Sequence, residues 1–171
     1  LSGIPLLAGT VDRAFNQNGE KEYFNSSIMM YPDGNIQMYH KVHLVPFAEY
    51  IPFSRNFPFL KELNFGQGNF SQGNEYTVFT VDSIQFSNII CYESSLPGII
   101  RKFIKRGARF MSIQANDGWL GNSSGPYQHF ELAKLRAVEN RISIVRCANT
   151  GISGFIQPTG RVSEKIPIGE K

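Results

Sequence analysis

The apolar residues of this chain come in short runs. None of these runs approaches the roughly 20 residues that a membrane-spanning helix needs. Most of them have the length of a buried strand, whereas two longer segments have the spacing of a helix. Alternating signals of this kind predict an α/β fold, layered in the α+β manner, with helices packed outside sheets.

A hairpin is the clearest local prediction. Residues 22–31 and 36–45 fit two strands, and the turn between them contains Pro32 and Gly34, which suit its backbone angles. Further strands are expected at residues 6–11, 76–81, 84–91, 110–115, 142–148 and 151–156. Helices are expected at residues 97–105 and 126–140, the second with an apolar face of Phe130, Ala133, Leu135, Ala137 and Val138.

Residues 46–75 are too rich in proline and glycine for a regular element, so we expect a long loop. The loop is unusual for its aromatic residues, which are Phe47, Tyr50, Phe53, Phe57, Phe59, Phe65 and Phe70. Either these side chains pack down onto the domain, or they form an exposed apolar rim.

Composition limits the size and the partners of the chain. With 171 residues, 42% of them hydrophobic and 18% charged, residues 1–171 are expected to form a single domain with a buried core. The net charge is only +3. The tightest basic cluster surrounds the first expected helix and fits a solvated helix face, so we expect no nucleic-acid partner.

Cys91 is the strongest candidate for a nucleophile. It ends the expected strand 84–91 and stands shortly before a helix that Pro97 can begin. A thiol at such a turn lies near backbone N–H groups that can hold an oxyanion. The alternative is a buried and inert cysteine. The only other cysteine is Cys147, and two cysteines do not make a disulfide framework.

Three charged residues add to this candidate site. Lys41 lies inside an expected strand, where an ammonium needs a partner or a cavity unless it points to water. Such a cation lowers the pKa of a thiol and stabilises an oxyanion. Glu49 is either a pocket acid or a surface charge, and Glu93 stands close enough to Cys91 to orient a neighbour.

The three histidines do not predict a metal site. His40 and His43 would point to opposite faces of their strand, and His129 has no ligand-like neighbours in the sequence. There is also no glycine-rich phosphate loop. We therefore expect neither a metal nor another cofactor.

Several segments, in this order, resemble the apolipoprotein N-acyltransferases, a family with a nitrilase-like (carbon–nitrogen hydrolase) domain. The segments are KVHLVPFAEYIP at residues 41–52, ICYE at 90–93, NDGWLG at 116–121, GPYQHF at 125–130, RAVENR at 136–141 and NTGIS at 149–153. The resemblance implies an α-β-β-α sandwich, which we expect to be truncated at both ends here.

The resemblance also implies roles for individual residues. It places Cys91 as the nucleophile and Lys41 as its cationic helper, and it makes Glu49, Tyr92 and Glu93 candidate active-site residues. The general-base glutamate of the family would lie before Leu1, so no residue is assigned to that role. Departures from the family pattern at Ala48, Leu96 and Leu120 affect only the shape of the acyl pocket.

The activity implied is acyl transfer in two steps. An acyl chain would move from a phospholipid to Cys91 as a thioester, and then to the N-terminal amine of a bacterial lipoprotein. The protein would act at the bacterial inner membrane, held by segments not included here, with this domain on the periplasmic side. The alternatives are a soluble amidase of the nitrilase superfamily and an inactive nitrilase-like domain.

Overall fold

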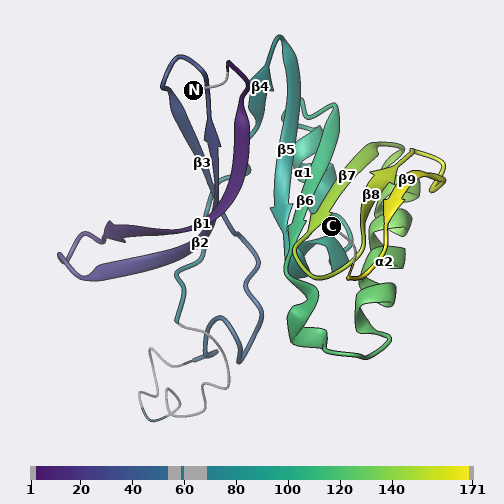
Figure 1. Ribbon diagram of the computed structural model, residues 1–171. Coiled ribbons are helices and arrows are strands. Elements are labelled where there is room, and N and C mark those ends of the chain that lie inside the picture. Colours follow the sequence, from purple (N-terminus) through teal and green to yellow (C-terminus); the bar gives the residue numbers. More distant parts are fainter. Residues whose placement is uncertain (1–2, 54–58, 60–68, 170–171) are drawn as a thin grey trace. The chain divides into compact units, whose positions relative to one another are not determined.

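The computed structural model describes residues 3–53, 59 and 69–169 and falls into two compact units. The first unit is Leu1–Glu75 and the second is Tyr76–Lys171 (Figure 1). Each unit contains its own sheet. That residues 1–171 form a single domain stays a prediction.

The first unit is built on a three-stranded antiparallel sheet in the order β1-β2-β3. Its strands are β1 (Leu6–Phe15), β2 (Lys21–Met30) and β3 (Ile36–His40). The predicted hairpin is confirmed, because the backbone N–H of Tyr31 donates to the carbonyl of Asn35 across the turn. The returning strand is shorter than predicted and ends at His40, so Lys41 and His43 follow the strand instead of lying within it.

The chain leaves the sheet at Lys41. The Lys41 N–H still donates to the carbonyl of Asn25 on β2, whereas the Lys41 carbonyl accepts from the N–H of Gly73 outside the sheet. Where the structure describes residues 46–75, they form no α-helix and no strand longer than a single bridge residue, as predicted. Phe47, Phe53 and Phe59 are exposed, whereas Tyr50 and Phe70 are half-buried. The other two aromatic residues named above, Phe57 and Phe65, lie outside the described residues.

The second unit contains a mixed six-stranded sheet in the order β4-β5-β6-β7-β8-β9. The strands are β4 (Phe79–Val81), β5 (Ile84–Ile90), β6 (Phe110–Ala115), β7 (Ser143–Ala148), β8 (Ser153–Ile156) and β9 (Val162–Ile166). The three central strands β5, β6 and β7 are parallel, and the outer ones pair antiparallel. Strand β4 is shorter than predicted, and β9 was not predicted at all.

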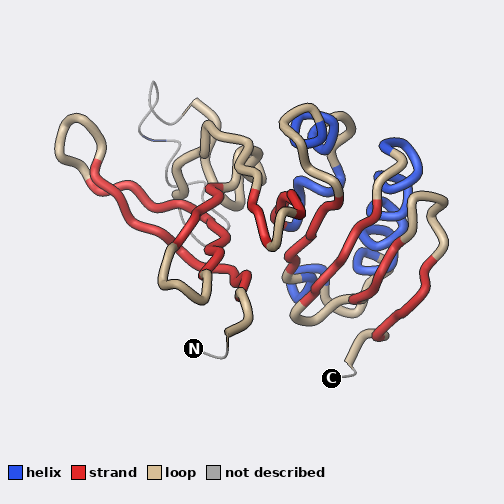
Figure 2. Tube along the Cα trace, turned by 90° about the horizontal axis from the view of Figure 1, so that it is seen from above, coloured by secondary structure: helices blue, strands red, loops and turns tan. Residues whose placement is uncertain are grey.

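Two helices connect the parallel strands. Helix α1 (Ile99–Ile104) leads from β5 to β6, and helix α2 (Gly125–Asn140) leads from β6 to β7. The helices contact each other and therefore cover the same face of the sheet, along which Figure 2 shows α2 running. Helix α1 starts later than predicted, because Gly98 before it has a left-handed φ of 80°.

Helix α2 has nearly the predicted bounds, but its buried face is narrower than predicted. Phe130, Ala133 and Ala137 are buried against the sheet, whereas Leu135 and Val138 are 47% and 46% exposed. The prediction for these last two residues was wrong. Neither helix has the length and apolar content needed to cross a membrane, and the described residues contain no other helix that does.

Candidate active site

Cys91 lies where the parallel strand β5 ends, an edge at which open α/β sheets commonly bind ligands. It is the first residue of a short 3-10 helix, η2 (Cys91–Ser95), and not the last residue of the strand as predicted. Its φ is 49°, in the left-handed region. That conformation costs a residue with a side chain roughly 1–2 kcal/mol, and such strain is typical of functional sites.

Glu93 ties η2 to the end of the strand. Its side chain is fully buried, and its Oε2 accepts a hydrogen bond of 2.8 Å from the backbone N–H of Ile90. Tyr92 stands between Cys91 and Glu93 and is half-buried. Two of the predicted site residues therefore lie in the same turn as Cys91, and one of them secures that turn.

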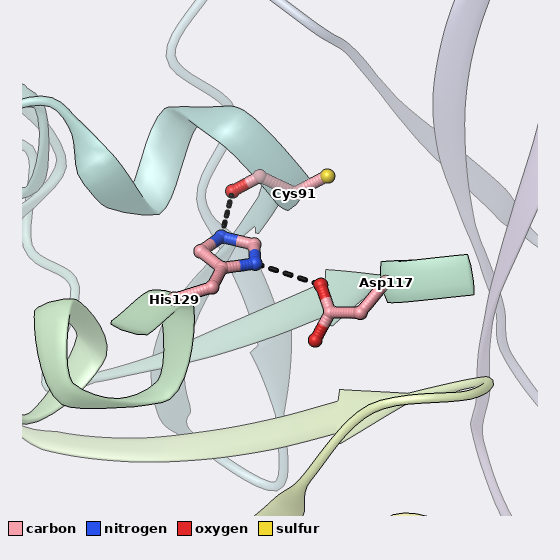
Figure 3. A group of neighbouring side chains, drawn as sticks. All are labelled: Cys91, Asp117 and His129. Atoms are coloured by element: carbon pink, nitrogen blue, oxygen red, sulfur yellow. Dashed lines mark hydrogen bonds and ion pairs between the residues drawn. The ribbon is translucent and has the colours of Figure 1, made fainter. Parts of the chain in front are cut away.

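The carbonyl group of Cys91 contacts two buried side chains. Ser94 donates its Oγ–H to the Cys91 oxygen at 2.8 Å, and His129 Nε2 lies 3.1 Å from the same oxygen. Ser94 Oγ and His129 Nε2 are themselves 2.7 Å apart. Figure 3 shows the sulfur of Cys91 directed away from the imidazole that meets its carbonyl group.

The other side of the His129 ring faces a buried ion pair. His129 Nδ1 lies 2.7 Å from Asp117 Oδ1. The other oxygen of this carboxylate accepts from Arg146 at 2.7 Å. Burial by itself would raise the pKa of Asp117, but the His129 hydrogen bond and the Arg146 charge lower that pKa below its ordinary 3.8. Asp117 is therefore an anion at neutral pH.

Three groups of metal-ligating type meet here, since donor atoms of Cys91, Asp117 and His129 lie within 4.8 Å of one another. The guanidinium of Arg146 already occupies the position beside this set, 3.1 Å from His129 Nδ1 and in contact with Asp117. A metal ion would meet that fixed positive charge at short range. We therefore assign the group as a hydrogen-bonded network.

Lys41 and Glu49 form a second buried cluster, in the first unit. Lys41 Nζ donates to both oxygens of Glu49 at 2.8 Å, and the ammonium is almost fully buried. Glu49 Oε1 also accepts from the side chain of Asn25, and Oε2 accepts from the backbone N–H of Val45, each at 2.8 Å. The structure thus brings together two of the predicted catalytic residues.

Five residues around these clusters were not predicted as site residues: Asn25, Ser94, Asp117, His129 and Arg146. His129 has no ligand-like neighbours in the sequence, but Asp117 and Arg146 reach it from other elements of the fold. His40 contacts Asp12 at 2.9 Å, within the sheet of the first unit. One signal was available for Asp117. It follows β6 as Cys91 follows β5, and neighbouring parallel strands end at the same sheet edge.

The sequence matches the carbon–nitrogen hydrolase family over residues 2–171. The chain belongs to the carbon–nitrogen hydrolase family. Among curated relatives, the apolipoprotein N-acyltransferase of Chlorobaculum tepidum is 42% identical over 84% of this chain and 29% of its own length. That of Rickettsia typhi is 37% identical over 99% of this chain and 34% of its own length. The chain thus spans about a third of these relatives.

Solved carbon–nitrogen hydrolases share the fold. A carbon–nitrogen hydrolase from Helicobacter pylori superposes with a TM-score of 0.73 at 14% identity, over 99% of this chain and 60% of its own. Saccharomyces cerevisiae Nit3, of the nitrilase superfamily, superposes with a TM-score of 0.68 at 22% identity, over 95% of this chain and 56% of its own length. The predicted nitrilase-like α/β fold is confirmed.

Proposed function

We propose that this chain is the catalytic part of an apolipoprotein N-acyltransferase. The reaction would move an acyl chain from a phospholipid, through a thioester on Cys91, to the N-terminal amine of a lipoprotein. The observation that carries the proposal is the position of Cys91, a strained residue at the carboxyl end of a parallel strand. The preference for acyl transfer over hydrolysis rests on relatives at 32–42% identity that bear this name.

Lys41 is the proposed electrostatic helper. An ammonium has three N–H groups, and Glu49 receives two of them, which leaves one for a developing oxyanion. Because Glu49 is held by further hydrogen bonds from Asn25 and Val45, the ammonium has a fixed direction. Glu49 therefore orients Lys41 in this proposal.

In the first step a base takes the proton of the Cys91 thiol, and the thiolate attacks the ester carbonyl of the phospholipid. Lys41 and a backbone N–H near Tyr92 hold the negative oxygen of the tetrahedral intermediate. The carbon–oxygen bond of the ester then breaks, and the lysophospholipid leaves with a proton. The acyl chain stays on sulfur as a thioester.

In the second step the N-terminal amine of the lipoprotein attacks the thioester carbonyl. The carbon–sulfur bond breaks, an amide forms, and Cys91 recovers its thiol when the amine loses its proton. Covalent transfer of this kind predicts ping-pong kinetics. The donor is a membrane lipid, so we place the reaction at the bacterial inner membrane, with this domain on the periplasmic side.

A second candidate function is amide hydrolysis, because solved relatives of this fold include an amidase. The amidase from Nesterenkonia sp. AN1 has been solved with acrylamide added covalently to its active-site cysteine. It shares 19% of its sequence with this chain. With the same nucleophile, water instead of a lipoprotein amine would release the acyl group. A non-catalytic domain of this fold is the third possibility.

Intact-mass spectrometry of the full-length protein, incubated with phospholipid in detergent, tests the proposal. We expect a mass gain of one acyl chain that hydroxylamine removes, because hydroxylamine cleaves thioesters. Cys91→Ala should lose the gain. Cys147→Ala is the matched control and should keep it, because Cys147 is the exposed second cysteine on β7. A lipopeptide with a free N-terminal amine should then discharge the adduct.

Other outcomes separate the alternatives. An adduct that survives Cys91→Ala would contradict the assigned nucleophile. No adduct with lipid, together with ammonia release from small amides, would establish the hydrolase. Failure of both assays would support the non-catalytic domain.

A further inference from the structure

We propose that Ser94 and His129 are positioning residues for the nucleophile. They would hold the carbonyl group of Cys91 and thereby keep this residue in its left-handed conformation. The role of Cys91 as nucleophile rests on the proposed function. The contacts of Ser94 and His129 with its carbonyl group do not depend on that function. Neither residue would touch the substrate.

The first step of the argument is the direction of the hydrogen bonds at the Cys91 carbonyl. A carbonyl oxygen only accepts, so Ser94 uses its single proton on that oxygen. Ser94 Oγ must then be the acceptor of its 2.7 Å contact with His129 Nε2. The N–H of His129 Nε2 therefore donates to two acceptors, Ser94 Oγ and the Cys91 oxygen.

The second step is what holds the His129 ring. Asp117 is ionised, and its Oδ1 lies 2.7 Å from His129 Nδ1, so the carboxylate fixes the ring on the side away from Cys91. Asp117 is fixed in turn by Arg146, which also donates to the carbonyl of Ile152.

The third step is the location of these groups in the fold. Asp117 follows β6, Arg146 lies on β7, and His129 lies on α2. All of these side chains are buried. The carbonyl of Cys91 is thus tied to the rigid centre of the second unit and not only to its own short helix.

The last step connects the carbonyl to the thiol. The carbonyl carbon and Cβ of Cys91 are bonded to the same Cα, so a fixed carbonyl also fixes the direction in which the side chain leaves the backbone. Without these bonds, a residue at φ 49° gains by returning to an ordinary conformation. That change would redirect the sulfur, and misplacement of a reacting atom by about 1 Å costs roughly 100-fold in rate.

Two variants of the full-length protein test this role. Ser94→Ala removes one of the two contacts to the carbonyl, and Ser94→Ala combined with His129→Phe removes both while keeping a ring in the cavity. We expect kcat for thioester formation to fall about tenfold in the first and about 100-fold in the second, with an unchanged KM for phospholipid. Alkylation of Cys91 by iodoacetamide should change less than about threefold, because this reaction needs no fixed geometry.

The matched control is Ser87→Ala. Ser87 lies on β5 and is as buried as Ser94, but its Oγ has no hydrogen-bond partner among the described residues. Its kcat should stay within about twofold of the unmodified protein. If Ser94→Ala lowers the melting temperature without lowering kcat more than Ser87→Ala does, the residue is only structural and the proposal is wrong. A parallel loss of alkylation and acylation would also overturn it, because the network would then act on thiol ionisation.

A crystal structure of Ser94→Ala/His129→Phe separates this inference from the proposed function. If the unmodified protein takes no acyl chain from phospholipid, the proposed function fails. The positioning role then still predicts that Cys91 leaves the left-handed region in this variant and stays there in Ser87→Ala. Retention of that φ in the double variant would overturn the inference whatever the reaction. Should the double variant not fold, the kinetics and structure of Ser94→Ala alone decide the question.

Discussion

Glu49 receives one hydrogen bond at each of the four lone-pair positions of its carboxylate. Lys41 supplies two of them, and Asn25 and Val45 supply the others, so each oxygen accepts twice. A general base needs a free lone pair that reaches the proton it abstracts. Glu49 is therefore suited to holding Lys41 and poorly suited to activating the thiol.

The variant Glu49→Gln tests the strength of this arrangement. Its amide would place an NH2 group against one of the donors, Lys41 or Val45, and leave the buried ammonium without a counter-charge. We expect the free energy of unfolding in urea to fall by roughly 3 kcal/mol. Glu131→Gln is the matched control, because Glu131 pairs with Lys134 on the exposed side of α2. In Glu131→Gln the free energy of unfolding should fall by less than about 0.5 kcal/mol. Equal falls in the two variants would show that burial does not strengthen the Lys41–Glu49 pair.

At the scale of elements, the segment after β3 is held by a close backbone approach. The Gly73 N–H donates to the carbonyl of Lys41. A Cβ on Gly73 would collide with the backbone carbonyl group of His40. No flexible side chain is available there to move aside, so position 73 requires glycine.

We therefore predict that Gly73→Ala destabilises the protein by about 1–3 kcal/mol, as overpacking generally does. Gly9→Ala on β1 should instead be neutral or stabilising, by up to about 1 kcal/mol, because a Cβ there meets open space and alanine restricts the unfolded chain. Urea unfolding of both variants measures whether the free energy of unfolding falls in the first and is unchanged or rises in the second. A neutral Gly73→Ala would mean that the segment moves away at little cost.

The sequence predicts elements well where their own side chains determine them. Strand β6 has the predicted bounds and α2 nearly so, because a buried apolar run or a helical period marks each. Strand β3 ends early because the carbonyl of Lys41 accepts from the distant Gly73, which no local pattern reveals. Strand β9 was missed because its residues are mostly exposed and polar, and therefore lack an apolar signal.

The candidate site was predictable to the same extent. Cys91, Lys41 and Glu49 stand in segments that the family resemblance marks. His129 also stands in such a segment, but neither it nor Ser94 was assigned a role, because their importance comes from contacts between α2, η2 and the end of β6. Those contacts depend on the register of the parallel strands, which the sequence does not display.

At the scale of the whole molecule, the proposed acyl transfer from a membrane lipid requires a surface that meets lipid. If the phenylalanines in residues 46–75 were fully buried, they could not make contact with lipid. Phe53 and Phe59 are instead 74% and 68% exposed. Exposed aromatic side chains of this kind suit contact with acyl chains.

If these side chains meet lipid, Phe53→Ser and Phe59→Ser should each raise KM for phospholipid in vesicles, by roughly fivefold to tenfold, because each removes apolar area that would be buried in the bilayer. The kcat for thioester formation should not change. Phe155→Ser is the control, since this phenylalanine lies on β8 and is also about half exposed, at 53%. If the control raises KM as much as the two loop variants, the loop has no special role in lipid contact.

The ionised Asp117 makes the second unit sensitive to acid. In the unfolded chain this carboxyl takes up its proton near its ordinary pKa of 3.8, whereas in the folded protein its lowered pKa delays the uptake to a more acidic pH. Its contribution to stability is therefore complete above about pH 5 and declines as the solution is acidified towards the folded pKa. The difference in unfolding free energy between the unmodified protein and Asp117→Asn should narrow over that range; a constant difference would contradict the linkage. Proton uptake at Asp117 would weaken its contact with the ring of His129. The ring would then hold the carbonyl group of Cys91 less firmly, so strong acid would displace the nucleophile without acting on the thiol itself.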